Sequence, residues 1–233
     1  MINAKIVLFG DSIGKGIVTE RNERAVTSAN AVHLFENKYS IEIDNRSKFG
    51  QTVAKCCRRK EIEKYLESLD RSVKNAVIIE LGGNDCAYFW ENVASAPDVK
   101  HDSVTPLKEF VEYYQNMLST IITSGVPVFC CSLVPINAKK YLDNVIGKIC
   151  DKEKVLKYFN GDYTVIYRHH EMFSDAIKSI CYASCIPVID LRETFVKTGD
   201  SDAYLCEDGI HPNERGQRLI FETVCDFAEG YLA

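Results

Sequence analysis

The sequence predicts an α/β fold, a three-layer α/β/α sandwich built on a five-stranded parallel sheet. Short β-branched runs alternate along the chain with longer stretches of helical periodicity. The short runs are mostly apolar throughout, as in strands that are buried on both faces. Strands that alternate with helices imply a parallel sheet with right-handed crossovers and helices on both faces. The five expected strands are residues 5–9, 41–45, 76–81, 126–132 and 187–191.

The clearest expected helix spans residues 106–124. We expect Thr105 to cap it, Pro106 to occupy its first turn and Gly125 to end it. Its apolar residues recur at helical spacing and predict a face that packs into the core: Leu107, Phe110, Val111, Tyr114, Leu118, Ile121 and Ile122.

A last helix is expected to begin at Pro212. Its apolar face would include Leu219, Ile220, Val224 and Phe227. Two irregular stretches, residues 85–105 and 198–212, follow strands or a short helix after a strand. Both can therefore reach the carboxyl edge of the sheet, where open parallel sheets bind ligands.

The composition is that of a soluble globular protein. Hydrophobic residues make up 46% and charged residues 26% of the 233 positions, and the formal charge is −5. No repeat, low-complexity tract or linker divides the chain, so we expect one domain over residues 1–233. The longest basic run, residues 58–60, is followed at once by acidic residues and reads as a solvated helix face. Nothing in this pattern favours a nucleic-acid partner.

The N-terminal apolar run from Ile6 to Phe9 is too short for the core of a signal peptide, and no segment approaches the ~20 apolar residues of a membrane span. We therefore expect a cytoplasmic protein. Ten cysteines without a secretion signal are expected to be reduced thiols, with Cys130 and Cys131 as small core residues. There is no Cys-x-x-Cys pair, and we expect no metal site.

The first chemical motif, GDSIGKG at residues 10–16, directly follows the first expected strand. Its glycines permit a tight strand-to-helix turn that exposes the hydroxyl of Ser12. A phosphate loop does not fit, because the glycine spacing is one residue short and Gly16 stands where Ser or Thr should be. A dinucleotide fingerprint fails because Thr19 replaces its third glycine. A glycine-rich turn without chemistry remains open for this segment alone.

Three further segments fall at the same predicted sheet edge. Asp208 and His211 are three residues apart, so the carboxylate can hold one imidazole nitrogen and leave the other as a proton acceptor. Asn84 follows the third expected strand and can donate to an oxyanion. Gly50 follows the second and lets a backbone N–H approach a ligand. Each of these, taken alone, also reads as a turn, a loop or a helix cap.

Taken together and in this order, the four segments resemble the SGNH family, the GDSL-type hydrolases. In that family the serine follows the first strand, and Asp and His form an Asp-x-x-His pair near the C-terminus. An ordinary α/β-hydrolase places its nucleophile mid-chain and separates its Asp from its His. The resemblance covers Gly10 to Pro212 through short motifs, with Ile13 in place of the leucine of the name motif.

The resemblance implies a flavodoxin-like SGNH hydrolase fold and a carboxylic ester hydrolase without a cofactor. Ser12 would be the nucleophile, His211 the general base and Asp208 the residue that orients it. The backbone N–H groups of Ser12 and Gly50 and the side chain of Asn84 would form the oxyanion hole. The expected partner is a small or medium acyl ester, such as an acetylated sugar or a short-chain lipid ester.

Two other functions stay open: acyl transfer to an alcohol on the same residues, and a non-catalytic binding protein of the same fold. For substrate contacts we expect Asp11, Phe89 and Trp90, with the aromatic residues as an apolar wall or a sugar-stacking surface. The aromatic residues could equally face the core of a short helix. The remaining histidines are expected to be surface or packing residues: His33, His101, His169 and His170.

Overall fold

The computed structural model describes residues 4–20 and 23–232. Its main sheet has five parallel strands in the order β4-β1-β5-β6-β7, which confirms the predicted sheet. The strands are β1 (Ala4–Gly10), β4 (Ile43–Asn45), β5 (Lys74–Glu80), β6 (Val128–Cys131) and β7 (Val188–Ile189). Each lies within or close to its predicted range.

A small antiparallel hairpin was not expected from the sequence. It pairs β2 (Ile17–Glu20) with β3 (Glu23–Val26), just after the GDSIGKG segment. All four residues of β3 are exposed. An exposed strand needs no apolar face, so its sequence carries none of the hydrophobic periodicity from which strands are recognised.

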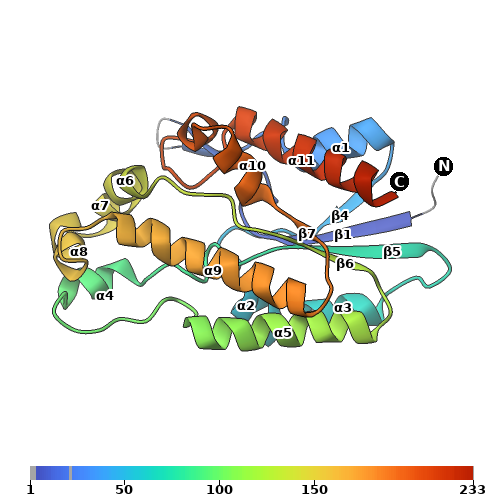
Figure 1. Ribbon diagram of the computed structural model, residues 1–233, viewed down its shortest axis with the longest axis horizontal. Coiled ribbons are helices and arrows are strands. Elements are labelled where there is room, and N and C mark those ends of the chain that lie inside the picture. The colour runs from blue at the N-terminus through green and yellow to red at the C-terminus, as the bar shows by residue number, and fades with distance from the viewer. Residues whose placement is uncertain (1–3, 21–22, 233) are drawn as a thin grey trace.

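Helices cover both faces of the main sheet, so the molecule has the predicted three layers (Figure 1). One face carries α1 (Ala31–Tyr39), α10 (Leu191–Lys197) and α11 (Glu214–Leu232). The other carries α2 (Val53–Arg58), α3 (Glu61–Glu67), α5 (Leu107–Thr123) and α9 (Thr164–Ala183). The apolar face expected for the last helix is confirmed, because Leu219, Ile220, Val224 and Phe227 pack together with β6, β7 and α10.

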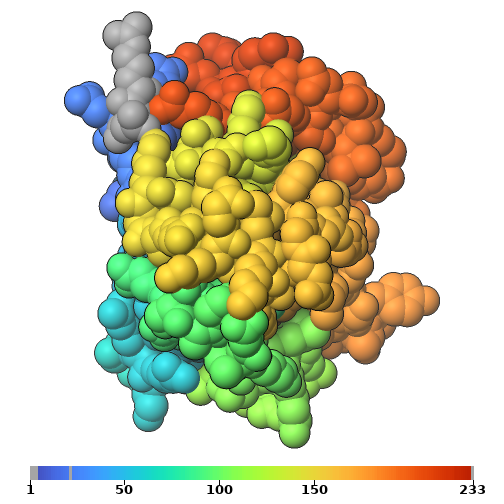
Figure 2. Space-filling view, turned by 90° about the vertical axis from the view of Figure 1, so that its left-hand side faces the viewer, coloured from blue at the N-terminus to red at the C-terminus, as the bar shows by residue number. Residues whose placement is uncertain are grey.

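Short helices gather beyond the carboxyl ends of the strands, at the left of Figure 1. They are α4 (Trp90–Ser95), α6 (Ala138–Tyr141), the π-helical turn η1 (Leu142–Ile146), α7 (Gly147–Ile149) and α8 (Lys152–Tyr158). We call this group the end lobe. Trp90, Leu142 and Phe159 belong to its own apolar cluster. Figure 2 looks onto this end, where yellow segments of the lobe lie between green segments below and orange-red segments above.

Both predicted helix starts were wrong in detail. The side chain of Thr105 does not cap α5, because its hydroxyl donates to Asp85 Oδ1 at 2.6 Å, and Pro106 itself is the cap residue. The last helix begins at Glu214 rather than Pro212, because Pro212 forms a β-bridge with Leu205. Asn213 then caps it by accepting from Gly216 N–H at 3.0 Å.

Two further features concern the chain as a whole. Within the described segments, no helix has the length and apolar character needed to cross a membrane. All ten cysteines lie in those segments and are free thiols, and Cys130 and Cys131 are buried as expected.

Adjacent isoleucines on α5 test the packing of the core. Ile121 is fully buried, as predicted, whereas Ile122 is 48% exposed, so the prediction that Ile122 packs into the core was wrong. We expect Ile121→Ala to lower the free energy of unfolding by about 2–5 kcal/mol, because it leaves a cavity in a close-packed core. Ile122→Ala should change it by no more than about 1 kcal/mol. Urea unfolding followed by circular dichroism measures both, and equal losses would contradict the described orientation of α5.

Candidate active site

Ser12 lies on the turn that follows β1, at the carboxyl edge of the sheet. Backbone hydrogen bonds close the turn, from Lys15 N–H to Asp11 O at 3.1 Å and from Ile17 N–H to Ser12 O at 2.9 Å. Asp11 Oδ1 also accepts from Ile13 N–H at 2.9 Å. The turn therefore fixes the backbone of Ser12 at the point where the main sheet ends.

The carboxylate of Glu80, at the end of the neighbouring strand β5, lies under this turn. Its Oε2 accepts from Asp11 N–H at 3.2 Å and from Gly14 N–H at 3.0 Å. A Cβ atom on Gly14 would lie 2.7 Å from Ser47 Oγ, so only a glycine allows the turn to lie this close to Ser47. Burial, with the nearby Asp11 carboxylate, raises the pKa of Glu80 well above its usual value.

Asp208 and His211 meet across a four-residue turn, as the sequence predicts. Asp208 Oδ2 lies 2.6 Å from His211 Nδ1, and Asp208 Oδ1 accepts from the backbone N–H groups of Ile210 and His211 at 3.0 Å each. Burial alone would raise the pKa of Asp208, but the hydrogen bond and charge of His211 outweigh it and hold that pKa at about 2. The carboxylate is therefore ionised and fixes the imidazole with Nδ1 as the proton donor.

The other imidazole nitrogen reaches the N-terminal turn. His211 Nε2 lies 2.9 Å from Ser12 Oγ, and Ser12, Asp208 and His211 are all buried. Because Nδ1 donates to Asp208, Nε2 is free to accept the serine proton. The structure thus brings together the three residues that the sequence singled out, in an arrangement that can activate a hydroxyl as a nucleophile.

The buried side-chain amide of Gln217, on α11, fixes the last helix relative to the turn that carries Ser12. Gln217 Nε2 donates to Ile13 O at 3.3 Å, and Gln217 Oε1 accepts from Ala31 N–H at 3.0 Å. One side chain therefore ties the last helix to both the serine turn and the first turn of α1. The sequence offered no signal for this role, because a single Gln on a helix is ordinarily a surface residue.

The expected oxyanion donors lie on the loops after β4 and β5. Gly50 has φ +67°, and the space around its missing Cβ is open. The amide nitrogen of Asn84 donates to Asp11 Oδ2 at 2.9 Å, so Asp11 orients the Asn84 side chain. Burial raises the pKa of Asp11 to about 6.

Asp85, which the sequence analysis did not single out, fastens these two loops to each other. It is fully buried, and its Oδ2 accepts from Val53 N–H at 2.9 Å while its Oδ1 accepts from the hydroxyl of Thr105. Burial raises its pKa to about 6. Because Val53 begins α2, directly after the Gly50 loop, this carboxylate sets the position of that loop relative to Asn84.

A pocket of about 650 Å³, its open mouth included, lies beside Ser12 and His211. Asn84 and Asp11 line it on the sheet side. Its remaining wall includes Trp90 and Tyr141 of the end lobe, three residues of α9, and three loop residues: Ile166, His169 and His170, and Tyr88, Val134 and Ile136.

The three expected substrate-contact residues differ in their placement. Trp90 lines the pocket but is 6% exposed, and its ring N–H donates to the hydroxyl of Tyr141 at 3.1 Å. Asp11 also lines the pocket, with its carboxylate engaged by the turn and Asn84. Phe89 lies outside the pocket lining and is 59% exposed. The bridge between Tyr88 and Ser103 makes this stretch extended, so neighbouring side chains point to opposite sides.

The other histidines divide into two groups. His33 and His101 lie outside the pocket lining, and their ring nitrogens bond to Glu36 and to the carbonyl of Ala96. His169 and His170 both line the pocket. Their polar helical surroundings gave no sign of this in the sequence. Among the residues that the structure describes, no cluster of three or more His, Cys, Asp or Glu side chains could hold a metal ion.

Solved structures with this architecture include several esterases. The lipase/acylhydrolase from Enterococcus faecalis has a TM-score of 0.66 and 19% identity, covering 97% of this chain and 96% of that chain. The acetyl xylan esterase AlAXEase has a TM-score of 0.65 and 17% identity, with 96% and 98% covered. The esterase EstA from Pseudoalteromonas sp. has a TM-score of 0.59 and 19% identity, with 98% of each chain covered. At these identities the likeness shows the fold.

The family is shown by a separate comparison. The model of the GDSL-like Lipase/Acylhydrolase family matches residues 8–219, which is most of the chain and contains all of the motifs described above. A search of curated proteins found no match. The chain therefore belongs to the GDSL-like lipase/acylhydrolase (SGNH) family and is a carboxylic ester hydrolase.

Proposed function

We propose that this protein is a serine esterase that hydrolyses a small or medium acyl ester, such as an O-acetylated carbohydrate or a short-chain lipid ester, through an acyl-enzyme on Ser12. The observation that carries the proposal is the continuous path of short hydrogen bonds from Ser12 Oγ through His211 to Asp208, beside a pocket with hydrogen-bond donors. This path supplies the base that a neutral hydroxyl needs in order to attack an ester.

In the acylation half, Ser12 Oγ attacks the ester carbonyl carbon while His211 Nε2 takes the hydroxyl proton. The carbonyl oxygen becomes an oxyanion that the N–H groups of Ser12 and Gly50 and the amide of Asn84 stabilise. When the tetrahedral intermediate collapses, the bond to the alcohol oxygen breaks and His211 returns its proton to that oxygen. The ionised Asp208 stabilises the imidazolium between these steps.

Deacylation repeats the sequence with water as the nucleophile. His211 Nε2 takes a proton from water, the hydroxide oxygen bonds to the acyl carbon, and the same donors hold the second oxyanion. Collapse breaks the bond to Ser12 Oγ, which regains its proton from His211. The products are the alcohol and the carboxylic acid, and the enzyme returns to its starting state.

Replacement of Ser12 tests the nucleophile. We expect Ser12→Ala to lower kcat for p-nitrophenyl acetate and butyrate by on the order of 10⁴–10⁶-fold, because Ser12 Oγ is the one hydroxyl of the described residues that bonds to His211 Nε2. A fluorophosphonate probe should label the wild type and fail to label the variant. Ser95→Ala, on the exposed side of α4, is the matched control and should keep full activity. An active Ser12→Ala enzyme would remove the proposed mechanism.

The proposed oxyanion hole has its own test at Asn84. We expect Asn84→Ala to lower kcat by roughly 10²–10³-fold with little change in KM, because the lost hydrogen bond forms fully only in the transition state. Asn92→Ala, an exposed residue of α4, is the control. Steady-state kinetics on the same esters decide the matter. A kcat within threefold of wild type would exclude the side chain of Asn84 from the oxyanion hole.

Glu80 acts in this proposal as a positioning residue, and its protonation gives a pH signature. The pKa of Glu80 is raised well above 4.5, and that of Asp11 is raised from 3.8 to about 6. The unfolded chain therefore loses these protons first, so both groups lower the stability as pH rises, Asp11 between about pH 4 and 6 and Glu80 from about pH 4.5 upward. A neutral side chain of the same shape should not show this loss.

We expect Glu80→Gln to gain stability relative to the wild type between pH 5 and pH 8 while it keeps most of the activity at pH 7, because the amide oxygen still accepts from Asp11 and Gly14. Glu80→Ala should lose stability by about 1–3 kcal/mol for each N–H left without an acceptor. Urea unfolding at the two pH values and kcat at pH 7 are the measurements. A stability difference between Glu80→Gln and wild type that does not change with pH would contradict the buried acid pair.

A further inference from the structure

His170 is a buried polar side chain in the wall of the pocket. It lies on α9, is 6% exposed, and belongs to the same pocket lining as Ser12. One of its ring nitrogens, Nδ1, is 3.3 Å from a terminal nitrogen of the Arg192 guanidinium. The mechanism proposed above gives neither residue a task.

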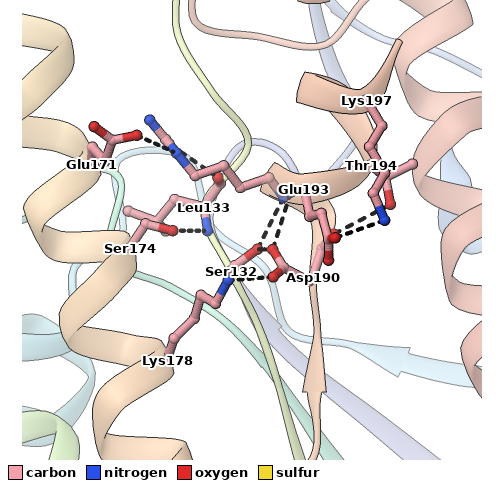
Figure 3. A network of polar contacts seen from close by, with 10 residues as sticks. Ser132, Leu133, Glu171, Ser174, Lys178, Asp190, Glu193, Thr194 and Lys197 are labelled. Carbon is pink, nitrogen blue, oxygen red and sulfur yellow. Dashed lines mark hydrogen bonds and ion pairs between the residues drawn. The ribbon is translucent and has the colours of Figure 1, made fainter.

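Arg192 is held rigidly behind His170 by groups at the ends of two strands. Its backbone N–H donates to Ser132 Oγ at 2.9 Å, and that hydroxyl donates to Asp190 Oδ1 at 2.7 Å. Lys178 also bonds to Asp190 (Figure 3). The network fixes the start of α10, which carries Arg192, relative to the carboxyl ends of β6 and β7.

The guanidinium itself is confined on several sides. It lies over the ring of Tyr167, with Cζ 4.8 Å from the ring centroid, and its Nε is 3.5 Å from the carboxylate of Glu171. The terminal nitrogen that faces His170 also lies 3.5 Å from the carbonyl oxygen of Leu133. Arg192 does not itself line the pocket, so His170 stands between the cation and the space beside Ser12.

This contact determines which nitrogen of His170 carries the proton. A guanidinium can only donate hydrogen bonds, so Nδ1 must accept and the proton resides on Nε2. Burial, with the positive charge of Arg192 and the neighbouring His169, lowers the pKa of His170 to about 3, so the ring is neutral. Nε2 has no hydrogen bond to any described residue. It is not among the side-chain atoms that are completely buried without a partner, so it keeps some exposed surface. The pocket is the space it can reach.

We propose that the Nε2–H group of His170 is a specificity-determining hydrogen-bond donor for the ester substrate, selecting groups that place an ether, hydroxyl or carbonyl oxygen in the pocket over plain hydrocarbon chains. The proposal rests on the serine esterase function proposed above and names the substrate class for that site. A hydrocarbon in the pocket strips water from Nε2–H without replacing its hydrogen bond, whereas an oxygen acceptor satisfies it. Such a mismatch lowers kcat/KM by on the order of 10–100-fold.

Pairs of esters that differ only by oxygen in place of a methylene group test the proposal. In the acyl arm, p-nitrophenyl methoxyacetate is compared with p-nitrophenyl butyrate. In the alcohol arm, 2-methoxyethyl acetate is compared with butyl acetate. The ratio of kcat/KM for the oxygen ester to that for its partner is measured in the wild type and in His170→Phe. Because intrinsic ester reactivity is the same in both proteins, the change in the ratio reports the side chain alone.

We expect the ratio to fall roughly 10–100-fold in His170→Phe in one of the two arms, and that arm identifies the half of the ester that occupies the pocket. His170→Gln, whose amide can both accept from Arg192 and donate to the pocket, should recover part of the ratio. His33→Phe, on the exposed side of α1, is the matched control and should leave the ratio unchanged. Ratios unchanged by His170→Phe in both arms of an active enzyme would overturn the proposal.

A second measurement needs no substrate and applies even if His170→Phe does not fold. Nuclear magnetic resonance of wild-type protein labelled with ¹⁵N-histidine distinguishes the two tautomers of each imidazole. We expect His170, assigned by the loss of its signal in His170→Gln, to carry its proton on Nε2 from pH 5 to 8. A proton on Nδ1 would overturn the proposal whatever the kinetics. Wild-type protein that neither cleaves any ester nor reacts with a fluorophosphonate would instead refute the esterase function.

Discussion

The hydrogen bond between Ser12 Oγ and His211 Nε2 joins residues that are 199 positions apart in the chain, and the site depends on it. Neither local sequence can maintain a 2.9 Å contact by itself, so the geometry is set by how α11 lies against the sheet. Gln217 makes that position specific, because its amide donates to the serine turn and accepts from α1. An apolar side chain in its place would leave the Ala31 N–H without this acceptor, at about 1–3 kcal/mol, whereas Ile13 O would keep its bond from Gly16 N–H.

Buried carboxyl groups position the rest of the site, as Gln217 positions the contact between Ser12 and His211. Glu80 holds the serine turn from below, Asp11 orients Asn84, and Asp85 binds the start of α2. Burial raises the pKa of all three above the usual value, so each costs folding free energy when the solution is neutral. The geometry explains their presence, since a carboxylate can accept several backbone N–H bonds from one point and so lock two loops together.

The sequence was informative where structure repeats a period or a motif, and uninformative where it depends on a single contact. The five strands follow from short runs that are apolar throughout, the apolar face of α11 follows from helical spacing, and Ser12, Asp208 and His211 follow from short motifs at the predicted sheet edge. Thr105 shows the limit, because its hydroxyl suits a helix cap and a buried carboxylate equally well, and only the fold brings Asp85 within reach. His170 was missed for a similar reason: a polar stretch of helix reads as solvent-facing until the fold is seen to place it in the wall of the pocket.

The two sides of the pocket are positioned by different parts of the fold. Ser12 stands on the turn directly after β1, where the sheet fixes it, whereas the opposite wall comes from α9, from loop residues, and from Trp90 and Tyr141 of the end lobe. Arg192 fixes His170 relative to the sheet, because it connects His170 to Ser132 and Asp190 at the ends of β6 and β7. The edge of the sheet that positions Ser12 therefore also positions the donor on α9. The sheet thus sets the distance between the attacking Ser12 Oγ and the proposed donor His170 Nε2.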